Sequence, residues 1–220
     1  MKDESKRQNG NLESEGSLLQ VADSLFGSVV ELMRSAKTEE DLRIGFEKTL
    51  ESLLKSIGIE TKPSYERLGN EAKTIYRGRP DAIHGQIIIE YEPPGAFSSD
   101  RSLLHANEQL ISYMTAQAQG HKINPLSLLN RLVGVGFDGH FIFFVQYPRK
   151  KNGDVATIDK SAFIRRGPYP FDSESARTFL TYLRALARLP LTAEGLALKF
   201  GPKSKVAPLA VSAFADALEH

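Results

Sequence analysis

The chain has 220 residues, of which 41% are hydrophobic and 25% charged, and its formal net charge is +1. These values are typical of a globular protein with a sizeable core, and they exclude nucleic-acid binding through a strong overall positive charge. The chain has no cysteine, which excludes disulfides and thiolate metal sites. No apolar run reaches the ~20 residues of a membrane helix, and the N-terminus lacks the apolar part of a signal peptide, so we expect a cytoplasmic protein without membrane contact.

The N-terminal third is expected to be helical after a short tail. Charged and small polar residues dominate positions 1–16, where we expect a disordered tail. Apolar residues then recur at helical spacing over residues 17–36, and a second helix is expected over residues 38–58. Thr38 followed three residues later by Asp41 has the pattern of a capping box, which fixes the start of the second helix.

Residues 79–92 predict a β-hairpin. The continuous β-branched run 87–89 is typical of a strand that is buried on both faces. If His84 and Gly85 are the two central turn residues, Asp81 and Glu90 become diagonal neighbours on one face, about 7–8 Å apart. This expectation depends on the register, because a slip of one residue would move one carboxylate to the other face.

The remaining elements complete a mixed fold. We expect one or two short strands over residues 59–76 and an amphipathic helix over 101–119. A second hairpin is expected over 132–147, with its turn at 138–139. A helix capped by Asp172 or Ser173 follows, and then two short helices over 192–200 and 204–217. The order predicts an α/β fold, with a mixed central β-sheet flanked by helices and a C-terminal helical segment. The expected division is a tail (1–16), a core with its N-terminal helices (17–171), a helical linker or annex (172–217), and a remnant (218–220) that resembles the start of a vector-encoded tag.

Three carboxylates, Asp81, Glu90 and Glu92, are expected on one face of the first hairpin. Clustered carboxylates repel one another, and an apolar strand is an unfavourable place to ionise them. A hard divalent cation removes this conflict, and Mg²⁺ prefers one or two carboxylates together with water and phosphate oxygens. The alternative interpretation is that Glu90 and Glu92 are solvent-facing residues at the end of a strand.

The motif Pro80-Asp81, eight residues and then Glu90-Tyr91-Glu92 resembles the signature of the PD-(D/E)xK nuclease superfamily. The segments 78–82 and 88–95 resemble, more specifically, the N-terminal nuclease region of single-chain, type IIG-like restriction-modification enzymes, in which it is fused to an adenine-specific DNA methyltransferase. Segments 191–196 and 199–204 are similar to the linker before such a methyltransferase. The resemblance covers about residues 38–217.

This resemblance implies a restriction-endonuclease-like core and a Mg²⁺-dependent endodeoxyribonuclease, with Mn²⁺ as a substitute ion. Double-stranded DNA is the implied partner, a downstream methyltransferase domain is implied in the full-length chain, and a homodimer is compatible with it. Asp81 and Glu90 are the implied metal ligands, and the Tyr91 carbonyl between the two glutamates is a further candidate. A catalytically decayed nuclease fold that binds DNA or a protein without cutting is the main alternative, and a metal-free glycoside hydrolase is disfavoured because the chain has no tryptophan.

Glu92 departs from the superfamily pattern. It stands where the superfamily usually has a lysine that orients or activates the attacking water, although some restriction endonucleases with Glu-x-Glu remain active. Glu92 is therefore expected to complete or tune the catalytic site. The general base stays open, with Lys122 or another distant lysine as one alternative.

Residues outside the hairpin complete the expected site. Gln109 and Tyr113 lie four apart on a helix and share a face; they resemble a Gln-x-x-x-Tyr element that supports the site or contacts the DNA backbone. The alternative is an ordinary surface glutamine and a half-buried tyrosine. Glu47 matches the superfamily's helix-borne acidic ligand, with Glu51 as a competitor for that role.

Residues 148–166 hold six basic and two acidic residues, a net charge of +4. Arg149, Lys150 and Lys151 are the candidates for phosphate contacts, and a solvated loop is the alternative. Gly134-x-Gly136-x-x-Gly139 matches a dinucleotide-binding fingerprint, but a strand is expected to follow where a helix should open, so we assign these glycines to the second hairpin.

Overall fold

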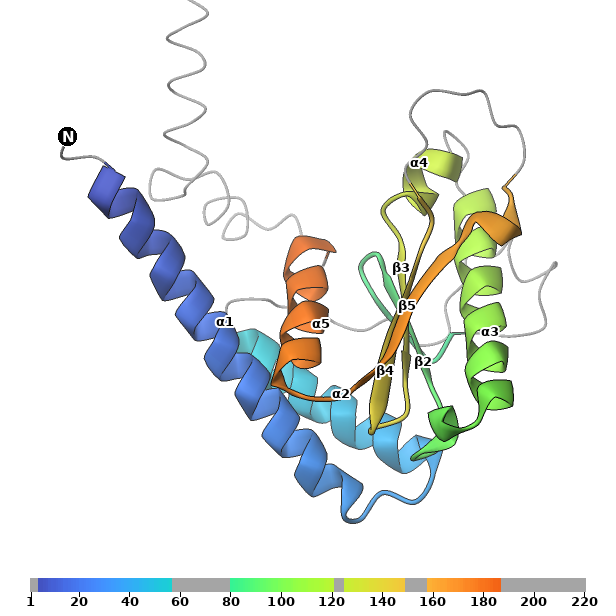
Figure 1. Cartoon of the computed structure of the whole chain (residues 1–220), viewed down its shortest axis with the longest axis horizontal. Helices are drawn as coiled ribbons and strands as arrows, with labels where there is room; N and C mark the ends of the chain where they lie inside the picture. Colours follow the sequence, from blue (N-terminus) through green and yellow to red (C-terminus); the bar gives the residue numbers. More distant parts are fainter. Residues whose placement is uncertain (1–3, 57–79, 121–124, 149–157, 187–220) are drawn as a thin grey trace, which may run out of the picture. The chain divides into compact units, whose positions relative to one another are not determined.

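The computed structural model describes residues 4–56, 80–120, 125–148 and 158–186. A five-stranded sheet has the order β1 (Ala82–His84), β2 (Ile87–Tyr91), β3 (Val133–Phe137), β4 (Phe141–Gln146) and β5 (Ile164–Pro170). Strands β2 and β3 are parallel and the other neighbours antiparallel. Helices α1 (Glu4–Met33), α2 (Glu39–Ser56) and α5 (Ser173–Leu186) cover one face, and α3 (Asp100–Gln119) covers the other (Figure 1). The expected α/β fold, a mixed sheet flanked by helices, is confirmed.

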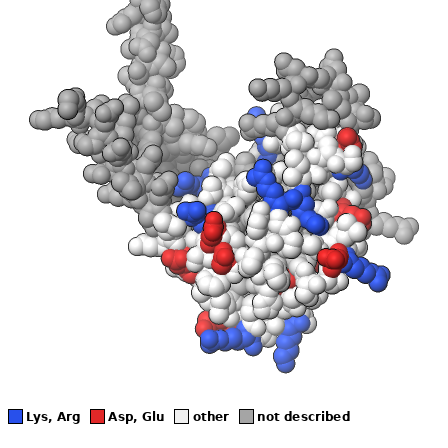
Figure 2. Space-filling model, in the orientation of Figure 1, with Lys and Arg blue, Asp and Glu red and all other residues white. Residues whose placement is uncertain are grey.

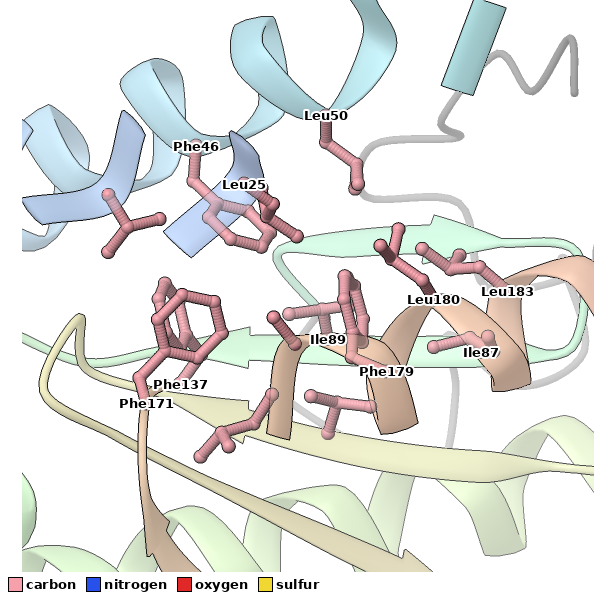
Figure 3. Close-up of a cluster of buried hydrophobic side chains, with 14 of the residues drawn as sticks. Leu25, Phe46, Leu50, Ile87, Ile89, Phe137, Phe171, Phe179, Leu180 and Leu183 are labelled. Carbon is pink, nitrogen blue, oxygen red and sulfur yellow. The ribbon is translucent and has the colours of Figure 1, made fainter. Parts of the chain in front are cut away.

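Two hydrophobic clusters hold the layers together, one on each face of the sheet. Ile87 and Ile89 of β2 point into the cluster formed with α1, α2 and α5 (Figure 3), and Ile88 points into the cluster beneath α3. All five residues of β2 are buried. Because both faces of β2 are covered, its apolar run has no polar alternation.

Helix caps form where the sequence places them. The hydroxyl of Thr38 accepts from the Asp41 N–H, and the Asp41 carboxylate accepts from the Thr38 N–H, both at 3.1 Å. Asp172 and Ser175 make the same reciprocal pair at the start of α5, which identifies Asp172 as the cap. These pairs satisfy N–H groups that the first helical turn leaves without partners.

Three expectations differ from the structure. Helix α1 begins at Glu4, so the tail expected over residues 1–16 is helical from its fourth residue, as an extension of the apolar-periodic helix after it. No strand is expected over β5, because Gly167, Pro168 and Pro170 and its mostly exposed side chains hide the pattern of a strand. The short helix α4 (Pro125–Leu129) was not expected either.

Some expected elements lie outside the described residues: the strands over 59–76 and the helices over 192–200 and 204–217. Two short 3-10 helices, η2 (Ala96–Ser98) and η3 (Lys160–Ala162), connect elements of the described part. None of the described helices is long and apolar enough to cross a membrane.

Candidate active site

The β1–β2 hairpin turns one residue later than expected. Ala82 pairs with Ile89 and His84 with Ile87, so Gly85 and Gln86 form the turn and His84 belongs to β1. Gly85 has a φ of 65°. A left-handed glycine is favoured at the first central position of a two-residue turn, and our expectation had placed Gly85 second. The expected register is therefore wrong: each residue of β1 pairs with a residue two positions later in β2 than expected, so that Ala82 lies opposite Ile89 and not Ile87.

This correction brings Asp81 closer to Glu90. Extending the observed pairing by one residue places Asp81 opposite Glu90, whereas we expected a diagonal relation. A shift of two residues preserves strand alternation, so Glu90 keeps the face of Ile88, which packs beneath α3. Asp81 lies just before β1 and is close enough to Glu90 for its charge to raise the pKa of Glu90. The N–H of Tyr91 donates to Oδ2 of Asp81 at 2.8 Å, which holds this carboxylate beside the end of β2.

Glu90 carries the most perturbed carboxyl group of the described site. Its side chain is 6% exposed, and its buried Oε2 has no hydrogen-bond partner. Burial raises the pKa of Glu90 to about 9, and the charges of Asp81, Glu92 and Glu39 add to the rise. Because a buried polar atom without a partner is costly, this oxygen is a candidate contact for a bound ion or water.

Glu92 and Glu39 complete the acidic group. Glu92 follows β2 and is partly buried; burial, and then the charge of Glu39, raise its pKa, while His105 lowers it. Glu39 is the first residue of α2, and burial followed by the charge of Asp81 raises its pKa. Sequence reasoning missed Glu39, because acidic residues are common in the first turn of any helix.

The structure does not bring Glu47 to these carboxylates. Glu47 lies eight residues after Glu39 on α2, about 12 Å along the helix axis. It accepts a hydrogen bond from the Tyr91 hydroxyl at 2.7 Å and contacts His84, both on the face of the sheet opposite Glu90. The helix-borne acidic residue beside Asp81 is Glu39, and Glu51, the other candidate, is exposed and pairs with Lys55.

Helix α3 places Gln109 and Tyr113 beside the carboxylates. Burial, followed by the charges of Glu90 and Asp81, raises the pKa of Tyr113. Tyr113 is only 4% exposed. It therefore offers no open surface for a contact with the DNA backbone, the second role that the sequence suggested for it. Gln109 has a buried Oε1 without a partner, a second such atom next to the hairpin.

Asp138 joins the segment that follows β2 to the β3–β4 turn through hydrogen bonds of its carboxylate. Its carboxylate accepts from the N–H groups of Phe97, His140 and Phe141 at 2.6–2.9 Å, and its own side chain is fully buried. The Glu92 N–H donates to the Phe137 carbonyl at 3.0 Å. These bonds fix the segment after Glu92 against the β3–β4 turn, and so they limit where the Glu92 side chain can reach.

The dinucleotide-like glycines have structural roles in this turn and strand. Gly139 has a φ of 85° at the expected β3–β4 turn. Gly136 pairs with Glu90, and the ring of Phe143 occupies the space that a side chain at this position would need. The Phe143 ring therefore lies over the residue that pairs with Glu90 on the adjacent strand, and it makes this part of the sheet apolar.

The donor set suits a hard cation. Mg²⁺ takes oxygen ligands and usually only one or two carboxylates, together with water and substrate phosphate oxygens. The unpartnered Oε2 of Glu90 and the carboxylate of Asp81 across the hairpin fit that requirement. No group of three or more Asp, Glu and His side chains in the described ranges is arranged to hold a metal ion, so the described part of the chain offers a carboxylate pair and no closed protein cage.

The basic candidates Arg149, Lys150 and Lys151 and the alternative base Lys122 lie outside the described residues. Comparison of the chain with family models, with curated proteins and with solved structures found no match in any of the three. The resemblance to the PD-(D/E)xK superfamily therefore rests on the residues of this chain alone.

Proposed function

We propose that this chain is the Mg²⁺-dependent endodeoxyribonuclease module of a restriction-modification enzyme and hydrolyses phosphodiesters of double-stranded DNA. The spacing of Asp81, Glu90 and Glu92 motivates the proposal. The observation that carries it is Glu90: a buried carboxyl group with a pKa of about 9, an oxygen without a partner, and Asp81 across the hairpin. Such a group ionises readily at neutral pH only when a cation compensates its charge.

In this proposal Asp81 and Glu90 hold the ion, with the Tyr91 carbonyl as a further predicted ligand. When bound there, a divalent ion would lower the pKa of a water and stabilise the charge that develops on the phosphate. The Tyr91 N–H orients Asp81, and the buried Tyr113 lies close enough to both carboxylates for their charges to raise its pKa. Glu39 takes the role that the sequence suggested for Glu47, and Glu92 tunes the charge of the site.

A catalytically decayed module that binds DNA or a protein partner is the second candidate. One observation favours it: Glu92 occupies the place where the superfamily usually has lysine, and its carboxylate raises the pKa of Glu90 further. An additional negative charge beside the scissile phosphate slows attack by an anionic nucleophile. The two candidates share the fold and differ in whether DNA is cut.

Calorimetric titration with Mn²⁺, combined with cleavage of supercoiled plasmid, tests the proposal. The wild-type chain should bind Mn²⁺ and nick or linearise the plasmid, and Asp81→Ala should lose both properties while keeping its circular-dichroism spectrum. Glu39→Ala should weaken Mn²⁺ binding. Glu40→Ala is its matched control, because Glu40 is the next residue of α2, is exposed and pairs with Arg43.

Each other outcome has a distinct meaning. Equal Mn²⁺ binding by the wild type and Asp81→Ala would place the metal site elsewhere and overturn the proposal. Binding of Mn²⁺ and DNA by the wild type without cleavage, across a range of DNA substrates, would favour the decayed module. Equal losses in Glu39→Ala and Glu40→Ala would remove the specific role given to Glu39.

A further inference from the structure

A buried polar cluster lies behind the hairpin, on the face of the sheet opposite Glu90. It consists of Glu47 from α2, His84 from β1 and Tyr91 from β2, and we name it the Glu47 network. The Nε2 atom of His84 lies 2.9 and 3.1 Å from the two Glu47 carboxylate oxygens, and the Tyr91 hydroxyl donates to Oε1 at 2.7 Å. All three side chains are at most 6% exposed.

The Glu47 network holds the hairpin at both of its ends. His84 is the last residue of β1, next to the turn, and Tyr91 is the last residue of β2, at the open end. Tyr91 contacts both groups, because its hydroxyl donates to Glu47 and its backbone N–H donates to Asp81. A chain of two hydrogen-bonded contacts therefore runs from α2 through Tyr91 to the carboxylate of Asp81.

Stability alone does not explain this arrangement. The network is set in an apolar cluster, in which Phe46 and Phe137 pack against the Tyr91 ring at centroid distances of 5.9 and 6.2 Å. Buried charged pairs can often be replaced by apolar residues of similar volume without loss of stability. Hydrogen bonds provide what apolar packing lacks, a fixed direction and register for the groups that they join.

We propose that the Glu47 network is a positioning device that sets the hairpin register and thereby the separation of Asp81 and Glu90. The inference rests on the proposed function, in which these two carboxylates hold the ion. Metal ligands depend on the groups behind them for their orientation, and loss of such supporting partners typically weakens metal binding about 10- to 100-fold. Glu47 thus acts on the site from the opposite face, through Tyr91, and does not touch the ion.

Two variants remove the network to different extents. Tyr91→Phe removes only the hydroxyl, and the triple variant Glu47→Leu, His84→Leu, Tyr91→Phe replaces the whole network with apolar side chains. Tyr182→Phe is the matched control, because Tyr182 packs against the same hydrophobic cluster and its hydroxyl donates to Gln146. His84→Gln is the conservative variant, because its amide can still donate to Glu47.

We expect Tyr91→Phe to lower Mn²⁺ affinity about tenfold or more, and to lower kcat for plasmid cleavage while leaving KM for DNA unchanged. The triple variant should melt near the wild-type temperature and lose more affinity, whereas His84→Gln and Tyr182→Phe should stay close to wild type. Wild-type Mn²⁺ affinity and cleavage in folded Tyr91→Phe, or in the folded triple variant, would overturn the proposal.

A metal-free measurement separates this inference from the proposed function. Amide hydrogen exchange at residue 91, followed by ¹⁵N NMR in EDTA, reports the bond to Asp81 directly. Exchange should accelerate in Tyr91→Phe and in His84→Leu but not in Tyr182→Phe. If the wild type binds no divalent ion, the proposed function fails and this readout decides the role of the network. Unchanged exchange in both network variants would then overturn the inference.

Discussion

Glu90 links the acid-base state of the site to the stability of the fold. Burial, with help from Asp81, Glu92 and Glu39, raises its pKa from 4.5 to about 9. The folded state therefore keeps a proton that the unfolded chain releases over this interval. The stability contributed by the protonated group is complete below about pH 4.5 and is lost as the pH rises through about 9.

Removing this ionisation should flatten the dependence of stability on pH. In EDTA, we expect the wild type to lose stability between about pH 5 and 9, with a slope approaching about 1.4 kcal/mol per pH unit from this group. Glu90→Gln, which cannot ionise, should lack that slope and melt at a higher temperature above neutrality. Thermal melts followed by circular dichroism at several pH values provide the measurement, and parallel curves for the two proteins would contradict the assignment.

Glu92 is the residue at which this chain departs from the superfamily it resembles. Glu92→Lys would replace one of the charges that raise the pKa of Glu90 with an opposite charge. If Glu92 holds a second ion, this variant should retain some cleavage and need only one equivalent of Mn²⁺, as counted by calorimetry. An unchanged metal stoichiometry would argue against a ligand role for Glu92. Full activity of Glu92→Ala would make it a bystander.

The β3–β4 turn is an element whose geometry depends on one buried carboxylate. Asp138→Ala leaves the N–H groups of Phe97, His140 and Phe141 without their acceptor. We expect a loss of about 3 kcal/mol or more in the free energy of unfolding, measured in urea. Asp138→Asn should lose less, because its oxygen can still serve the two N–H groups that Oδ1 now accepts.

Asp100→Ala is the control for this prediction. Asp100 is exposed in the first turn of α3, where its contribution should be a few tenths of a kcal/mol. A similar loss in Asp138→Ala and Asp100→Ala would mean that the turn does not depend on the buried carboxylate.

Elements with strong local patterns could be predicted from the sequence. Helix α3, the β3–β4 hairpin and the Thr38 cap follow from helical spacing, a glycine turn and a capping pair. Strand β5 could not be predicted, because an edge strand with two prolines and exposed side chains has little alternation between apolar and polar residues.

Of the candidate site, the nearness of Asp81 to Glu90 could be predicted from the sequence, but the acidic residue that α2 places beside them could not. The expected proximity of Asp81 and Glu90 survived the error in register, since a shift of two residues preserves strand alternation. The choice between Glu39 and Glu47 could not be made from the sequence. It depends on where α2 crosses the sheet, which tertiary packing decides and helical periodicity does not.

At the scale of the molecule, the two edges of the sheet differ in chemistry. The acidic group lies at the β1–β2 edge, and β5 forms the opposite edge. Arg165 and Arg166 of β5 are exposed. Figure 2 shows a group of Lys and Arg side chains near the centre of the view, with Asp and Glu side chains on the same face around it. The separation of these two arginines from the acidic group, at opposite edges of the sheet, is compatible with the proposed function, in which a duplex is held by its phosphates while one phosphate reaches the proposed metal ligands.

This separation leads to a prediction about DNA binding. The proposed nuclease module would contact mainly phosphates. We therefore expect the chain to bind a labelled duplex without sequence preference, with an affinity that falls steeply with salt, by about 0.9 in logarithmic slope per phosphate neutralised. Replacement of Arg149, Lys150 and Lys151 by alanine should flatten the slope by up to about three units. Fluorescence anisotropy across a salt series measures it, and Mn²⁺ binding should not change.

Arg165→Ala, Arg166→Ala provides the comparison that locates the DNA path. These arginines belong to the described edge strand, so their loss tests whether phosphates run along β5 itself or only along residues 149–151. A flatter slope in both variants would extend the path over the edge. An unchanged slope in both would place the path away from β5 and from residues 149–151. Strong preference for one sequence would contradict phosphate-directed binding, because backbone contacts carry no information about the bases.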